Sequence, residues 1–252
     1  MVVACYGVLK TAHAEPDTAE NEVPVIKTFV LEMIPHDTSA FTQGLELDGH
    51  TLYEGTGNVG TSQLRELDSV AGAVRRAVTI PADFFGEGIT VVDDRIWQLT
   101  WRDGVAIEWD RATLTPRREV AVDGEGWGLC RDGDRLIRSD GTDRLRFHDA
   151  KDFAEIGAVN VTRNNHPLTH LNELECVDGQ VWANVWLTNE IVRIDPATGM
   201  VTAVVDASAI AGGQGQNDDE VLNGIAHIDG DEFLLTGKNW PTIFRVRIDL
   251  NG

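Results

Sequence analysis

The chain has 252 residues, of which 42% are hydrophobic and 25% are charged, and its formal net charge at pH 7 is -20. This composition is typical of a globular protein with a substantial core. The acidity argues against partners such as nucleic acid or anionic membrane surfaces, which attract basic patches. It favours cationic ligands, including amino termini, or else serves solubility in general. No apolar run approaches the roughly 18 residues that span a bilayer, so we expect no membrane insertion.

The first residues have features of an export signal. A short apolar stretch precedes Ala12-His13-Ala14, which matches the pattern of a secretory cleavage site, although no basic segment comes before it. Val2-Val3-Ala4-Cys5 also resembles a bacterial lipoprotein box. We therefore expect residues 1–22 to be an export signal and disordered spacer, and residues 23–252 to be a single domain. The mature protein would be periplasmic, attached to the cell envelope or secreted.

An internal repeat organises the rest of the chain. Each unit opens with a motif that contains glycine or asparagine, alternates apolar and polar residues up to an acidic turn, and continues with further alternating strands. The acidic turns of the five units are at Asp48, Asp93, Asp132, Asp178 and Asp229. Several strands per unit, at a period of about 40 to 50 residues, predict the blades of a β-propeller.

The alternating pattern predicts these strands in chain order: residues 24–35; then 41–48, 51–54, 63–68 and 73–80; 85–93, 95–101, 105–110 and 117–122; 124–132, 135–139, 144–149 and 153–159; 171–178, 180–186, 190–195 and 201–206; and 222–229, 232–236 and 243–249. The last unit lacks a fourth strand, which the leading segment 24–35 can supply. That exchange would close the ring and remove the open sheet edges. We therefore predict an all-β fold, a five-bladed β-propeller closed by an N-terminal strand that completes the last blade.

Two long connections and three cysteines remain. Residues 160–170 and 207–220 are long enough to form lids over one face. Three cysteines are too few for a disulfide framework, and they lack the C-x-x-C spacing of a zinc site. Cys130 and Cys176 lie at similar places in successive units and could pair only if their Cα atoms come within about 7 Å. We expect two buried free thiols.

Polar and aromatic residues recur in the opening motifs of the units and at their second strands. The innermost strands of a propeller line its channel, so these positions should meet on one face. The polar residues are Gln43, Glu87, Glu125, Asn172, Glu173, Asn223 and Lys238, and the aromatic residues are Phe41, Phe85, Trp101, Trp127 and Trp186. An aromatic cup with a lysine, carboxylates and carboxamides is typical of a small-molecule site. Each tryptophan could instead pack blade against blade, as we expect for Trp97 and Trp182.

Glu87 is the candidate acid/base. Gly86 and Gly88 on either side let the backbone approach a neighbour closely. Aromatic neighbours would partly desolvate the carboxylate and raise its pKa toward neutral pH, where it can exchange protons with a substrate. Taken alone, Glu87 could equally be a solvated surface carboxylate. The recurrence of similar stretches along the chain favours the functional interpretation.

Several longer motifs match a known family. They are Phe41-Thr-Gln-Gly-Leu, Phe85-Gly-Glu-Gly-Ile-Thr, Gln98-Leu-Thr-Trp, Glu125-Gly-Trp-Gly-Leu, Leu171-Asn-Glu-Leu-Glu, Val181-Trp-Ala-Asn-Val-Trp and Thr236-Gly-Lys-Asn-Trp-Pro. With these motifs, residues 25–249 resemble the plant- and bacterial-type glutamine cyclotransferases. The resemblance implies a five-bladed propeller that converts an N-terminal glutamine, free or in a peptide, into pyroglutamate with release of ammonia. It implies a pocket of Phe41, Gln43, Phe85, Glu87, Trp101, Trp127, Asn172, Trp186 and Lys238.

These residue types suit that reaction. The three pocket tryptophans would hold the glutamine side chain folded back on its α-amine. Lys238, with a carboxamide of Gln43 or Asn172, would stabilise the charge on the amide oxygen. Glu87 would carry the proton from the attacking nitrogen to the departing one, and a single carboxylate suffices for this shuttle. We therefore expect no catalytic metal and no cofactor, a monomer, and partners that are peptides or proteins with N-terminal glutamine.

Two other functions remain open at this stage. A calcium-dependent, lactonase-like propeller hydrolase would use Glu87, Asn172 and Asn223 as oxygen ligands of a central ion. Such enzymes have six blades, whereas the repeat here occurs five times. The other possibility is a binding propeller on the cell surface that has no catalytic activity.

Overall fold

The structure is a computed structural model that describes residues 1, 22–215, 217 and 219–249. Within these residues the elements are β-strands and one short helix, which confirms the predicted all-β class. No described helix has the length and apolar character needed to cross a bilayer. The export signal and spacer expected at residues 1–22 lie almost entirely outside the described part of the chain, as does Cys5.

Three four-stranded antiparallel sheets follow one another along the chain. The first consists of β2 (Thr42–Asp48), β3 (Thr51–Thr56), β4 (Gln63–Asp68) and β5 (Val74–Thr79). The second consists of β6 (Gly86–Val92), β7 (Arg95–Thr100), β8 (Val105–Asp110) and β9 (Thr115–Ala121). The third consists of β10 (Leu129–Asp132), β11 (Arg135–Arg138), β12 (Arg144–Asp149) and β13 (Glu155–Asn160).

The remaining strands form one eight-stranded sheet in the order β16-β17-β18-β19-β1-β22-β21-β20. Its strands are β16 (Leu171–Val177), β17 (Gln180–Val185), β18 (Glu190–Ile194), β19 (Val201–Asp206), β1 (Val25–Pro35), β22 (Thr242–Ile248), β21 (Glu232–Gly237) and β20 (Leu222–Asp229). The leading strand β1 pairs antiparallel with β22, as predicted, from Thr28↔Ile248 to Pro35↔Thr242. It also pairs in parallel with β19, from Val25↔Val204 to Lys27↔Asp206.

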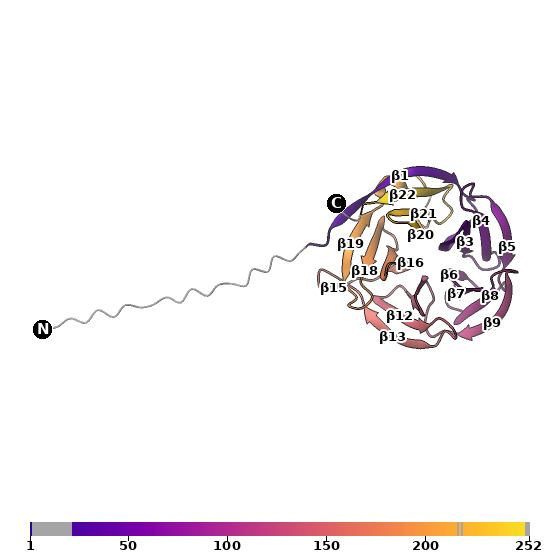
Figure 1. The fold of residues 1–252 in the computed structure, drawn as a ribbon, viewed down its shortest axis with the longest axis horizontal. Helices are drawn as coiled ribbons and strands as arrows, with labels where there is room; N and C mark the ends of the chain where they lie inside the picture. Colours follow the sequence, from indigo (N-terminus) through magenta and orange to yellow (C-terminus); the bar gives the residue numbers. More distant parts are fainter. Residues whose placement is uncertain (2–21, 216, 218, 250–252) are drawn as a thin grey trace.

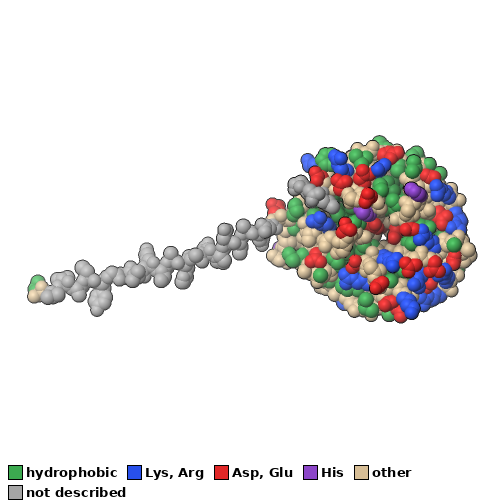
Figure 2. Space-filling view, in the orientation of Figure 1, with side chains coloured by type: hydrophobic (Ala, Val, Ile, Leu, Met, Phe, Trp, Pro, Cys, Tyr) green, Lys and Arg blue, Asp and Glu red, His purple; other side chains and the backbone are tan. Residues whose placement is uncertain are grey.

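The sheets stand around a common axis (Figure 1). The first strand of each successive unit contacts the first strand of the next, in the order β2, β6, β10, β16 and β20, and β20 contacts β2 again. In Figure 1, the indigo strand β1 lies beside β22 near the C-terminal end of the chain, where it joins the two ends of the ring. Acidic and basic side chains are interspersed over the face in Figure 2.

One predicted strand is shorter than expected. We predicted a strand over 124–132, but β10 begins only at Leu129. The segment before it is instead hydrogen-bonded to β6 of the neighbouring sheet, where the Gly88 N–H donates to the Trp127 carbonyl at 2.8 Å. A Cβ atom at Gly88 would lie 2.6 Å from that same oxygen, so glycine permits the approach.

The two long connections contain little regular structure. Residues 160–170 include β14 (Thr162–Arg163) and β15 (His166–Pro167), which pair as a small hairpin. Residues 207–220 include the helix α1 (Ser208–Ala211). Near its C-terminal end, each connection contacts the ring of sheets. The His170 ring lies 6.0 Å from the Trp186 ring, and the indole N–H of Trp240 donates to the Glu220 carbonyl at 3.0 Å.

Apolar side chains fill the spaces between neighbouring sheets. Trp97 is 0% exposed and its ring lies 4.9 Å from that of Phe153. Trp182 is 2% exposed and its ring lies 5.0 Å from that of Phe233. Trp97 therefore packs between two sheets and Trp182 between the two halves of the eight-stranded sheet, which agrees with their prediction as packing residues. The buried carboxyl of Glu173 accepts N–H bonds from Leu45 of β2 and Ile225 of β20, so it ties three inner strands together.

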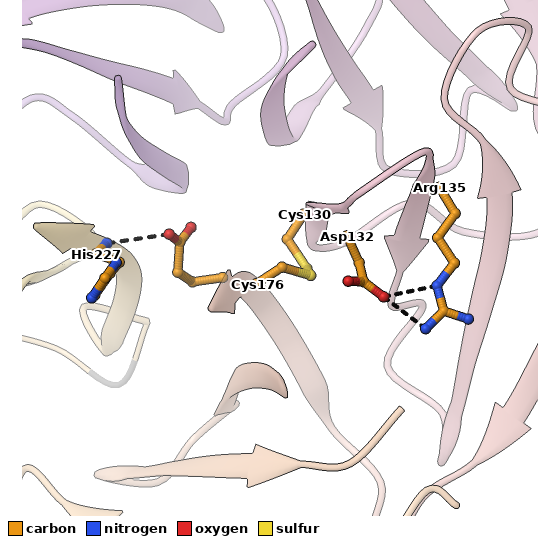
Figure 3. The surroundings of a disulfide bond; sticks show 6 residues. Cys130, Asp132, Arg135, Cys176 and His227 are labelled. Carbon is orange, nitrogen blue, oxygen red and sulfur yellow. Dashed lines mark hydrogen bonds and ion pairs between the residues drawn. A yellow bond between two sulfur atoms is a disulfide. The ribbon is translucent and has the colours of Figure 1, made fainter. Parts of the chain in front are cut away.

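The expectation of two free thiols is wrong. Cys130 and Cys176 form a disulfide with a Cα–Cα distance of 5.4 Å. Figure 3 shows the bond joining β10 to β16, the inner strands of neighbouring sheets. The two cysteines occupy matching positions on adjacent inner strands, and such positions come within bridging distance when the sheets stand side by side around the axis. Sequence spacing alone did not place them so closely.

Removing this disulfide is expected to lower the free energy of unfolding by about 4 kcal/mol, because the bond closes a long loop in the unfolded chain. The cysteines are 46 positions apart. Urea unfolding of the oxidised and the reduced protein measures the difference. The double variant Cys130→Ser, Cys176→Ser serves as the control, since its stability should not respond to reductant. Equal stability of the oxidised and reduced wild type would contradict the prediction.

Candidate functional site

One cavity, of about 240 Å³, gathers all nine residues predicted for the pocket. It is lined by Phe41, Gln43, Phe85, Glu87, Trp101, Trp127, Asn172, Trp186, Asp219 and Lys238. Gln43, Glu87 and Asn172 lie at the starts of β2, β6 and β16. They meet because the first strands of the units contact one another around the axis. Side chains far apart in the sequence are thereby placed on one face of the ring.

Glu87 is almost completely buried, with 4% exposure. Its Oε1 accepts a hydrogen bond of 3.3 Å from the Gln43 carboxamide. Burial raises the pKa of the Glu87 carboxyl well above its ordinary value, and the charge of Glu125 adds to the rise, while that of Lys238 opposes it. The carboxyl can therefore take up and release a proton at a pH where an ordinary carboxylate is fully ionised.

Lys238 lies on the same cavity, directly after β21, and is 6% exposed. Burial lowers the pKa of its ammonium, and the charges of Glu87 and Asp219 partly restore it. The Nζ atom lies 4.9 Å from the centroid of the Phe41 ring, so the aromatic face supports the cation. A cation and a proton-exchanging carboxyl thus occupy one desolvated space.

The carboxamides of Asn223 and Gln43 form a chain of hydrogen bonds that ends at Glu87. Asn223 donates to the Gln43 side-chain oxygen at 3.2 Å and to the Thr42 carbonyl at 2.9 Å. This bond directs the Gln43 NH₂ group toward Glu87. The calcium-site alternative needed Asn223 to face the same space as Glu87 and Asn172, but Asn223 does not line the cavity. Among the described residues, no group of three or more His, Cys, Asp and Glu side chains is placed to hold a metal ion.

Aromatic rings form the walls of the cavity. The Phe85 ring lies 6.2 Å from Phe41, edge to face, and 5.5 Å from Trp101. The Trp127 and Trp186 rings meet edge to face at 5.5 Å. Such contacts restrict the rings and leave a narrow apolar slot. A short side chain with a polar end fits such a slot.

Glu125 holds two of these walls in place. Its Oε2 accepts the indole N–H groups of both Trp101, at 2.8 Å, and Trp127, at 2.9 Å. Its Oε1 accepts from Arg102 at 2.8 Å. Burial raises the pKa of Glu125, but the bonds from Trp127, Arg102 and Trp101 outweigh this and keep the pKa below its ordinary value. We expected Glu125 among the polar cavity residues; instead its carboxylate anchors the two indoles and does not line the cavity.

Replacing Glu125 with alanine is expected to raise KM for a peptide that begins with glutamine about tenfold, with a smaller change in kcat. Two indoles lose their common acceptor, so the aromatic walls of the cavity become less rigid. Steady-state kinetics measure the split, and tryptophan emission reports the loosening. Glu155→Ala is the matched control: Glu155 is also an arginine-paired glutamate of similar exposure, and it lies outside the cavity. An unchanged KM in Glu125→Ala would refute the anchoring role.

One cavity residue, Asp219, was not predicted from the sequence. It comes from the connection between β19 and β20, which we predicted to be long enough to form a lid. The signal available was the acidic run Asn217-Asp-Asp-Glu220 within a segment otherwise rich in glycine and glutamine. A run of acidic residues is ordinarily a solvated surface, so it did not single out one carboxylate.

This chain is similar to known proteins over most of its length. The family model described as glutamine cyclotransferase matches residues 1–248. The chain is 35% identical to the glutaminyl-peptide cyclotransferase of Arabidopsis thaliana over 236 residues, which is 90% of this chain and 72% of that protein. The crystal structure of Myxococcus xanthus glutaminyl cyclase superposes with a TM-score of 0.85 at 38% identity, over 91% of this chain and 99% of that one. A family match along the whole chain and a shared fold lead to one conclusion: the protein belongs to the glutamine cyclotransferase family of enzymes.

Proposed function

We propose that this protein cyclises the N-terminal glutamine of peptides or proteins to pyroglutamate and releases ammonia. The observation that carries the proposal is the buried Glu87 carboxyl beside the Lys238 ammonium in a cavity walled by aromatic rings. The Arabidopsis relative is named a glutaminyl-peptide cyclotransferase, which points to the same substrate class. Glutamine suits the cavity because its side chain is short and ends in a carboxamide.

The reaction needs one proton to move between two nitrogens. The neutral α-amine attacks the γ-carboxamide carbon, so a C–N bond forms and the ring closes. Glu87 accepts the proton from the attacking nitrogen. The carbon then loses its original nitrogen, which leaves as ammonia after Glu87 returns the proton. The reaction needs no proton donor or acceptor other than Glu87.

The transition state carries negative charge on the former amide oxygen. Lys238 stabilises this oxygen as a cation, and the Asn172 carboxamide, which lines the same cavity, donates a hydrogen bond to it. Trp101, Trp127 and Trp186 hold the side chain folded toward its own amine, which brings the attacking nitrogen close to the γ-carbon. Exclusion of water by the aromatic walls strengthens both interactions.

The decisive experiment incubates the protein with a peptide that begins with glutamine. Ammonia release and a peptide mass lower by one ammonia are the expected results. Exhaustive dialysis against chelator should leave the rate unchanged, because the proposed shuttle uses side chains only. The same peptide beginning with asparagine is the control, since its shorter side chain would have to close a strained four-membered ring. Absence of ammonia from the glutamine peptide would rule the function out.

We also propose a blade count, a cellular location and an oligomeric state for this protein. Each half of the eight-stranded sheet, β16–β19 and β20–β21–β22–β1, is a four-stranded antiparallel unit like the three separate sheets. Counted in this way, the ring is a five-bladed propeller in a single domain spanning residues 23–252. The disulfide supports an exported location, because such bonds persist in oxidising compartments. The proposed enzyme is monomeric and binds neither nucleic acid nor membranes.

A further inference from the structure

Asp219 differs from every other residue that lines the cavity. The other nine are buried or half-buried, whereas Asp219 is exposed. Gln43 and Glu87 lie at the buried end of the cavity, with exposures of 3% and 4%. Asp219 therefore marks the mouth of the cavity, the end that opens to solvent. A peptide whose first residue lies against Glu87 would emerge at this open end, which Asp219 lines.

The segment that carries Asp219 is tied to the ring. The Asp219 N–H donates to the Asn217 side chain at 3.0 Å, and the Glu220 N–H donates to the Asn217 carbonyl at 3.1 Å. The Trp240 indole donates to the Glu220 carbonyl at 3.0 Å. These bonds set the backbone of residue 219 at the mouth. None of these bonds uses the Asp219 carboxylate.

No ion pair among the described residues neutralises the charge of Asp219. Among the described residues, Asp219 forms no ion pair within 4.0 Å, and its carboxylate accepts no hydrogen bond. Lys238, the cation that lines the cavity, is 6% exposed, and its pKa responds to the charge of Glu87 more than to that of Asp219. A carboxylate at an open mouth attracts a cation that approaches from solvent and repels an anion.

The proposed reaction places a specific part of the substrate at this mouth. When glutamine occupies the aromatic slot, the residue that follows it in the peptide is the first to reach solvent, beside Asp219. We propose that Asp219 makes the enzyme select peptides in which lysine or arginine directly follows the N-terminal glutamine, and disfavour aspartate or glutamate there. This inference rests on the proposed function and adds the substrate class within it.

The test compares three amidated peptides, Gln-Lys-Ala, Gln-Ala-Ala and Gln-Glu-Ala, by kcat/KM at low ionic strength. Wild type should prefer the lysine peptide over the glutamate peptide about tenfold, and Asp219→Asn should reduce this ratio to about twofold. Asp219→Lys should invert the order. Asp178→Asn is the matched control, because it removes the same charge from a turn at the opposite end of β16 from Asn172. It should keep the wild-type ratio despite the same change in net charge.

Salt gives a second readout that needs no variant. Raising the ionic strength to about 0.5 M should shrink the wild-type preference toward that of Asp219→Asn, because exposed charges are screened over a few ångströms. A preference that survives high salt, a ratio unchanged in Asp219→Asn, or equal wild-type rates on all three peptides would overturn the inference. Failure of wild type to release ammonia from Gln-Ala-Ala would instead count against the proposed function. The two failures are therefore distinguishable.

Discussion

Glu87→Gln is expected to lower kcat for a glutamine-leading peptide by at least about a hundredfold, while KM stays within about twofold. Glutamine has nearly the shape of glutamate, so it can keep the contact with the Gln43 carboxamide and leave the cavity intact. It cannot accept a proton from the attacking amine. The loss therefore falls on the chemical step, and steady-state kinetics separate it from binding.

The pH profile carries the same prediction. Glu87 must be ionised to act as the base, and burial raises the pKa of its carboxyl well above 4.5. Activity should therefore be present above that raised pKa and disappear as the pH falls through it, at a pH where ordinary carboxylates remain ionised. The residual activity of Glu87→Gln should lack this limb. Profiles of kcat rather than kcat/KM remove the titration of the free substrate amine.

The matched control for this variant is Glu119→Gln. Glu119 lies on β9, is exposed, and does not line the cavity. Its replacement makes the same chemical change without touching the site, so its kinetics should equal those of wild type. Wild-type turnover in Glu87→Gln would show that another group moves the proton.

Lys238→Met is expected to lower kcat/KM by about a hundredfold to a thousandfold, the usual loss when one donor to a developing oxyanion is removed. Methionine retains an unbranched apolar stem only one atom shorter than that of lysine, so the wall formed with Phe41 can persist. The oxygen of the transition state then lacks its cation. Lys238→Arg, which keeps the charge, should recover part of the rate.

A second effect of Lys238→Met distinguishes this role from a merely structural one. The charge of Lys238 holds down the pKa of the Glu87 carboxyl. Without that charge the pKa of Glu87 should rise further, and the acid limb of the kcat profile should move to higher pH. In wild type, burial lowers the pKa of Lys238 below 10.5, so activity should also fall as alkaline pH removes its proton.

Lys151→Met is the control for charge loss in general. Lys151 is an exposed lysine outside the cavity, so its replacement should leave both the rate and the pH profile unchanged. A Lys238→Met enzyme that keeps its rate within about threefold would show that oxyanion stabilisation comes from carboxamides alone. An acid limb that moves to lower pH would show that Lys238 does not act on Glu87.

The site was largely predictable because its residues obey the repeat. Gln43, Glu87 and Asn172 occupy equivalent places at the starts of inner strands, and equivalent places in a ring of similar units meet on one face. Periodicity and motif resemblance together therefore identified nine lining residues. Lys238 follows a second strand rather than a first one, and it was predicted from that place in the fifth unit and then from a matching motif.

Three features escaped prediction because each depends on a contact between units. The disulfide required Cys130 and Cys176 to come within 5.4 Å across two sheets, and spacing along the chain does not report that distance. Glu125 does not line the cavity, and its carboxylate accepts two indole N–H groups of the cavity walls instead. Asp219 lies in an irregular connection, where no repeat pattern predicts the position of a side chain.

By itself, the sequence determined the strand pattern, the all-β class and the kinds of side chain that the active face would hold, because alternation and repetition are local properties of the chain. Only the tertiary structure decided which of those side chains line the cavity, which one braces its walls and which carboxylate lies at its mouth. Those outcomes depend on how neighbouring sheets pack and on which hydrogen-bond donors and acceptors pair between them.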